Sequence, residues 1–183
     1  MKEAQLTAAR IVMDVMEGNN LNKVFQKYSK ENKINLKDIS QIKDLVFGTL
    51  RSYGKTKFVI NKLVKRTPSN ALILTLLHIA LFQLISNRSN SYTVVDQAVS
   101  ASKMINKRHT KFVNGVLRSF LREKAGILDK AEKIDEAKYS YPIWWINLIK
   151  NEYPKSWNNI LDIGNLHPPL IIRVNIKKGS ISN

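Results

Sequence analysis

The 183-residue chain contains no cysteine. A disulfide framework and a thiolate metal site are therefore excluded, together with the protein classes that depend on either. Glycine and proline are scarce, at 7 and 5 residues. An all-β fold needs many tight turns, which these two residues supply, so their scarcity favours helices. Hydrophobic residues make up 44% of the chain, which is enough for a packed core.

Long hydrophobic runs are also missing. The most apolar stretch, residues 71–85, contains Thr75, His78 and Gln83. It is shorter than the roughly 18 residues that a membrane-spanning helix needs. The first five residues, Met1 to Gln5, are polar and do not form a secretory signal. We therefore expect a cytoplasmic protein with no membrane partner and read residues 71–85 as part of a buried helix.

Acidic side chains are almost absent from the middle of the chain, and this accounts for most of the net charge of +16. Residues 45–122 hold 13 basic side chains and 1 acidic one, Asp96, whereas the rest of the chain holds 17 and 13. We interpret Asp96 as part of a helix cap beginning at Thr93. A surface without acids is typical of proteins that bind polyanions, either nucleic acid or an anionic membrane. Membrane binding ranks lower, because the apolar helix faces are needed for the core.

Apolar residues recur with helical spacing through the first 124 residues. The pattern predicts seven helices joined by short loops, among them helices over residues 55–66, 69–85 and 110–124. The predicted fold class is therefore all-α, with residues 1–124 as a compact helical bundle.

The remainder of the chain has a different pattern. Residues 125–138 are charged with mixed sign and predict a linker. Residues 139–183 predict a short helical segment followed by one β-strand over residues 170–176, which we interpret as the truncated start of a second domain.

Motifs for catalysis are not found. The sequence has no dinucleotide fingerprint, P-loop, nucleophile motif or cluster of metal ligands. The three histidines are far apart, and His78 lies on an apolar helix, where a role in the core is the simpler interpretation. We therefore expect no cofactor and no metal in this chain, and not a complete enzyme.

Basic residues supply the candidate binding site. The first set runs through a helix end, a turn and the next helix, and consists of Lys103, Lys107, Arg108, Lys111, Arg118 and Arg122. Members four residues apart share a helix face, and free backbone N–H groups at a helix start also bind phosphate. The second set is Lys55, Lys62, Lys65 and Arg66. Replacing Lys107, Arg108 and Lys111 with Ala is expected to weaken nucleic-acid binding with little loss of fold.

Three segments resemble motifs of the NusB-like domain, in the same order and spacing. They are Leu45–Arg51, Leu77–Leu84 and Phe112–Arg118. The segments Tyr141–Trp144 and Asn165–Asn175 resemble the region directly after that domain in bacterial 16S rRNA (cytosine-C5)-methyltransferases of the Sun/Fmu type. Two glycines in the motifs, Gly48 and Gly115, predict places where helices approach closely.

The resemblance implies that this chain is the RNA-recognition module of such an enzyme, with 16S ribosomal RNA and a catalytic domain as its partners. S-adenosylmethionine and a cysteine nucleophile would belong to that domain, which we expect after Asn175. One alternative is a free-standing antitermination factor that binds RNA with a protein partner. A second is a scaffold that dimerises through the apolar helix over residues 69–85.

Overall fold

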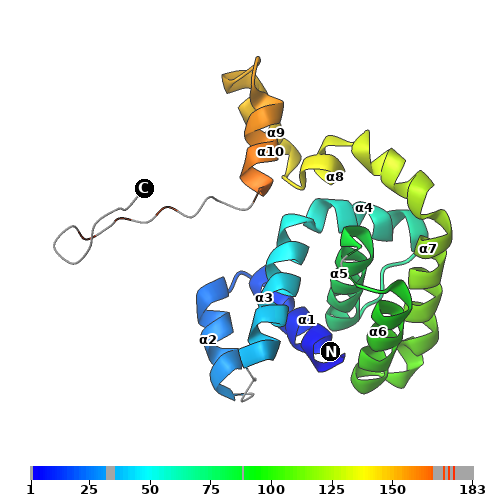
Figure 1. Ribbon diagram of the computed structural model, residues 1–183. Coiled ribbons are helices and arrows are strands. Elements are labelled where there is room, and N and C mark those ends of the chain that lie inside the picture. Colours follow the sequence, from blue (N-terminus) through cyan, green and yellow to red (C-terminus); the bar gives the residue numbers. More distant parts are fainter. Residues whose placement is uncertain are drawn as a thin grey trace.

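The computed structural model describes residues 2–31, 36–87 and 89–166, together with Ile171, Arg173 and Asn175. Those residues form ten α-helices, one 3-10 helix and no strand (Figure 1). In chain order the elements are α1 (Lys2–Met16), α2 (Leu21–Glu31), α3 (Leu36–Arg51), α4 (Tyr53–Leu63), α5 (Ala71–Ser86), α6 (Ser91–Ile105), η1 (Lys107–His109), α7 (Thr110–Glu132), α8 (Asp135–Tyr139), α9 (Ile143–Glu152) and α10 (Trp157–Asn165). The all-α prediction and the seven helices of the bundle, α1 to α7, are confirmed.

The strand predicted over residues 170–176 lies mostly outside the described residues. The three that are described, Ile171, Arg173 and Asn175, are not part of a strand. The pattern of β-branched residues there does not produce a sheet in the described part of the chain, where no other strand is present to pair with it.

Helix α5 is the centre of the bundle. Its residues Leu76 and Ile79 belong to a core shared with α1, α2 and α3, whereas Leu77 and Leu81 belong to a core shared with α4, α6 and α7. All four side chains are fully buried. The buried helix is therefore confirmed, but the dimerisation alternative is wrong, because neighbouring helices of the same chain cover the faces of α5.

Helix starts and ends differ from the predictions where a local cap decides them. Helix α4 ends at Leu63, so Lys65 and Arg66 lie in a bend and not in a helix. Helix α6 begins at Ser91, because the Asn90 side chain accepts hydrogen bonds from the backbone N–H groups of Tyr92 and Thr93. The cap predicted at Thr93 is therefore wrong.

Helix α7 continues eight residues beyond its predicted end at position 124, through the region predicted as a linker. Ile127 and Ala131 are buried and continue the apolar face of Phe120 at spacings of seven and eleven. In the sequence this helical spacing is hard to recognise, because charged residues lie between Phe120, Ile127 and Ala131. Only two residues, Lys133 and Ile134, separate α7 from α8.

Helices α8 to α10 form a small unit beside the bundle (Figure 1). Its core consists of Tyr139, Ile146, Ile149 and Leu161, with Tyr141, Trp145 and Trp157 packed around them. Within the described residues, no helix is both long enough and apolar enough to span a bilayer.

Candidate nucleic-acid interface

An open groove of about 330 Å³ lies between the bend after α4 and the first half of α7. Lys65 and Arg66 line it from the bend, and Lys111 lines it from α7. These three residues come from the two basic sets of the sequence. The fold therefore joins sets that are 45 residues apart, because α4 packs along α7.

The floor of the groove is small and partly apolar. Gly115 and Ser119 line it at spacings of four and eight from Lys111, with Phe112 and Val116 beside them. No atom lies within 4 Å of the position where a Cβ on Gly115 would stand. The close helix approach predicted at Gly115 is therefore wrong: this glycine leaves the groove open.

A stripe of cations continues from the groove along α7. Lys111, Arg118 and Arg122 are exposed and share one helix face, since their spacings are seven and four. The Arg122 guanidinium donates to the Ser119 hydroxyl at 2.9 Å, and this contact orients the arginine along the helix. The stripe can track a run of phosphates more readily than one isolated cation.

Lys103, Lys107 and Arg108 extend the basic surface around the start of α7. All three are exposed, at the end of α6 and in η1. The turn that carries Lys107 and Arg108 is held by Asn106, whose side chain accepts a hydrogen bond from the backbone N–H of Arg108 at 3.0 Å. Because the Asn106 cap stabilises this turn, the charged groups of Lys107 and Arg108 are not needed to hold it.

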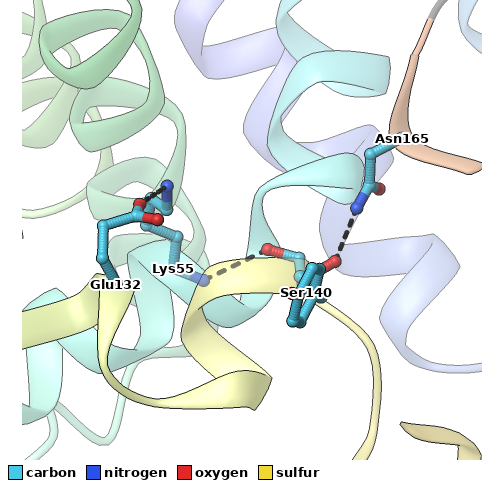
Figure 2. Close-up of polar contacts among 5 residues, drawn as sticks. Lys55, Glu132, Ser140 and Asn165 are labelled. Carbon is cyan, nitrogen blue, oxygen red and sulfur yellow. Dashed lines mark hydrogen bonds and ion pairs between the residues drawn. The ribbon is translucent and has the colours of Figure 1, made fainter. Parts of the chain in front are cut away.

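The remaining members of the second set are divided. Lys62 is exposed in the last turn of α4, and its Nζ lies 5.4 Å from the centroid of the Phe58 ring. Lys55 lies at the other end of α4, where its Nζ pairs with the Glu132 carboxylate at 2.7 Å (Figure 2). The structure therefore brings Lys65, Arg66 and Lys111 together in the groove, whereas Lys55 lies outside the groove and pairs with Glu132.

Six residues of the groove were missed by the sequence reasoning, namely Leu63, Val64, Phe112, Gly115, Val116 and Ser119. A signal for two of them was present, because Lys111, Gly115 and Ser119 succeed one another at intervals of four on one helix face. The bend that faces them could not be inferred from the α7 sequence.

His78, the only histidine in the apolar core helix, is buried and hydrogen-bonded, as predicted. Its Nδ1 lies 2.7 Å from the Thr56 hydroxyl, and its ring stacks on Tyr53 at 4.6 Å between centroids. Burial, with a smaller contribution from Lys57, lowers the pKa of His78 to about 4. This cluster links α4 to α5 and is separate from the groove.

Two family models match the chain. The NusB family model matches residues 2–122, and the model of the Methyltr_RsmF/B-like, ferredoxin-like domain matches residues 141–183. All three motifs that carry the resemblance fall inside the first match, and the tail motifs fall inside the second.

Curated relatives agree with these matches. The "Probable ribosomal RNA small subunit methyltransferase B" of Coxiella burnetii is 36% identical over 151 residues, which are 79% of this chain and 34% of that protein. The "Ribosomal RNA small subunit methyltransferase B" of Yersinia pseudotuberculosis is 32% identical over 172 residues, covering 92% of this chain and 39% of that protein. The chain thus spans little more than a third of the length of these relatives. Because the first family model covers well over half of its residues, the chain belongs to the NusB family.

Proposed function

We propose that this chain binds ribosomal RNA as the recognition module of an S-adenosylmethionine-dependent 16S rRNA (cytosine-C5)-methyltransferase. The observation that carries the proposal is the groove that joins Lys65, Arg66 and Lys111 from separate parts of the sequence. The names of the relatives supply the substrate, ribosomal RNA of the small subunit. The cytoplasm, where that RNA is found, is the expected compartment.

In this proposal the groove recognises the RNA backbone. Cations on both walls contact phosphates, and the open floor at Gly115 lets the sugar-phosphate chain approach the helix. The stripe through Arg118 and Arg122 extends the contact to neighbouring phosphates. Backbone contacts of this kind set the orientation of the RNA and do not read its sequence.

In this proposal the methyl-transfer reaction takes place in the catalytic domain and not in this chain. The family's cysteine nucleophile has no counterpart here, because the chain contains no cysteine. S-adenosylmethionine would be bound by the catalytic domain, which is the second partner of this module. The antitermination alternative is disfavoured by residues 141–183, which match a domain named after methyltransferases.

The test measures RNA affinity against salt for a 16S rRNA hairpin. The native chain is expected to bind with a negative log–log slope of roughly 0.7 per single-stranded phosphate contacted. The groove variant Lys65→Ala/Arg66→Ala/Lys111→Ala should bind at least tenfold more weakly, with a slope shallower by about 2, because three phosphate contacts are lost. Only Lys111 is shared with the triple variant that the sequence suggests, since Lys107 and Arg108 do not line the groove.

The control removes the same charge elsewhere. Lys23, Lys27 and Lys30 are exposed on α2, away from the groove, and their replacement by Ala should reduce affinity only slightly. Equal losses in both variants would mean that net charge alone drives binding. A charge-neutral variant, Gly115→Leu, should fill the groove and weaken binding while the fold is retained, because its Cβ meets no atom.

A further inference from the structure

Helix α8 packs unusually closely on the first turn of α4. A Cβ on Gly54 would overlap the backbone carbonyl oxygen of Glu136 and would lie 2.8 Å from the Cα of Ser140. Both obstacles are backbone atoms, so no change of rotamer can relieve them. Any residue other than glycine at position 54 must therefore move α8 away from the bundle.

Polar contacts hold the same junction on either side of Gly54. The Lys55 ammonium pairs with Glu132 at the end of α7, and the Lys55 backbone N–H donates to the Ser140 hydroxyl at 3.4 Å (Figure 2). Ser140 has a φ of 57°, a left-handed conformation that is costly for a residue with a side chain. Such a conformation persists where the surrounding structure determines it. The junction is thus held by packing, by an ion pair and by a defined turn.

The opposite side of α8 is part of the C-terminal unit. The Asn165 side-chain amide donates to the Tyr139 carbonyl at 2.6 Å, which ties α10 to α8 (Figure 2). The Lys150 ammonium pairs with Asp135 at 2.5 Å, which ties α9 to α8. Because Tyr139 is also buried in the core of that unit, α8 packs as one unit with α9 and α10.

Two helices run from this junction to the basic groove. In α4, Gly54 precedes Lys62 by eight residues, or about 12 Å at 1.5 Å per residue. In α7, Lys111 lies near the start and Glu132 is the last residue. The sequence predicts a linker over residues 125–138, and a flexible linker there would let the two parts reorient freely. In the structure α7 instead continues to Glu132, and only Lys133 and Ile134 separate it from α8.

We infer that Gly54 is a positioning residue: its contact with α8 fixes the direction in which RNA held in the groove is presented to the segment that begins at α9. The inference rests on the proposed function, since the direction matters only if the groove holds RNA. Gly54 does not touch the RNA itself. Its substitution changes where the RNA lies relative to α9, and not how tightly it is bound.

The geometry is tested without RNA. The chain has no cysteine, so Asp96→Cys on α6 and Asn151→Cys on α9 can carry the only two spin labels, both at exposed positions. Gly54→Ala is expected to shift or broaden the distance distribution measured by electron paramagnetic resonance. The matched control is Gly126→Ala, which adds the same methyl group to a helix where it meets no atom. An unchanged distribution in Gly54→Ala overturns the inference.

The second arm tests presentation of the RNA. An iron–EDTA group on Asn151→Cys cleaves a bound 16S rRNA hairpin near α9. Gly54→Ala should move or spread the cleavage sites while the Kd changes less than twofold, and Gly126→Ala should leave them in place. The same sites in Gly54→Ala overturn the inference. If the native chain binds no RNA, the proposed function fails, and the label distances still decide whether Gly54 sets the geometry.

Folding of the variant is expected, because neither core of the bundle contains a residue after Leu128. Lys55→Ala is a second variant that adds no atoms and removes the ion pair with Glu132. It should broaden the label distances in the same way as Gly54→Ala but by less. A distribution of label distances narrower than that of the native chain would contradict the proposed role of this junction in positioning α8.

Discussion

His78 is neutral in the folded protein, since burial holds its pKa at about 4. Its neutral ring shares a hydrogen bond with Thr56 and stacks on Tyr53. In the unfolded chain the same group titrates near its ordinary value of 6.5. Between these two pH values the unfolded state binds more protons than the folded state, so protonation favours unfolding.

We therefore predict that stability falls as the pH drops from about 6.5 toward 4, by on the order of 2 kcal/mol between pH 7 and pH 5. Urea unfolding at several pH values measures this. In His78→Gln the loss over this interval should be much smaller, whatever the stability of that variant at pH 7. An equal loss in both proteins would assign the pH dependence to other groups.

Two lysines of one sequence set have different surroundings. Lys55 and Lys65 are only ten residues apart in the chain. Lys55 pairs with Glu132, whereas Lys65 lines the groove beside Lys111. The two lysines differ in the residues from distant parts of the chain that lie beside them. A sequence pattern within one helix does not specify those neighbours.

Helix crossings depend on small residues at particular positions. At the crossing of α3 and α5, a Cβ on Gly48 would overlap the ring of Phe82. The close approach predicted at Gly48 is therefore confirmed, in contrast to Gly115. The half-buried Phe82 ring packs against the core around α1 to α3, so a methyl group added at Gly48 must displace the ring from that packing.

We predict that Gly48→Ala destabilises the protein by about 1–3 kcal/mol, because the added methyl group overpacks this crossing. Gly126→Ala should instead stabilise α7 by up to about 1 kcal/mol, since alanine is the better helix former and its Cβ meets no atom. Chemical unfolding of the two variants compares the same substitution in opposite surroundings. Stabilisation of both would show that Phe82 moves aside without cost.

The molecule as a whole consists of a bundle with two cores and a C-terminal unit with one small core. The smaller unit leaves large apolar side chains in solvent, with Trp144 65% exposed and Ile163 67% exposed. Exposed apolar side chains on adjacent helices are typical of surfaces that contact another protein or domain.

We predict that the chain self-associates with increasing concentration through α9 and α10, as sedimentation velocity can measure. Trp144→Ser/Ile163→Ser should reduce this association and leave RNA affinity unchanged, because both residues lie outside the groove. Met104 on α6, 55% exposed, provides the control site, and Met104→Ser should have no effect on association. Association that survives the double variant would place the contact elsewhere.

Much of this protein is determined locally. The helical period of apolar residues determined the seven helices, the buried position of α5 and of His78, and three motifs sufficed to recognise the family. The depletion of acids marked residues 45–122 as the candidate binding region. These features arise from short-range rules, since the period, the caps and the charge of a helix face depend on residues within a few turns.

Tertiary structure alone decided the rest. It showed that Lys65 and Arg66 face Lys111, that Lys55 is engaged by Glu132, and that Gly54 brings α8 against α4. It also distinguished two glycines: a Cβ added to Gly48 would overlap Phe82, whereas a Cβ added to Gly115 would meet no atom. The physical reason is the same in each case: a groove, an ion pair and a close approach each need two elements far apart in the chain. Which elements meet is set by how the whole core packs.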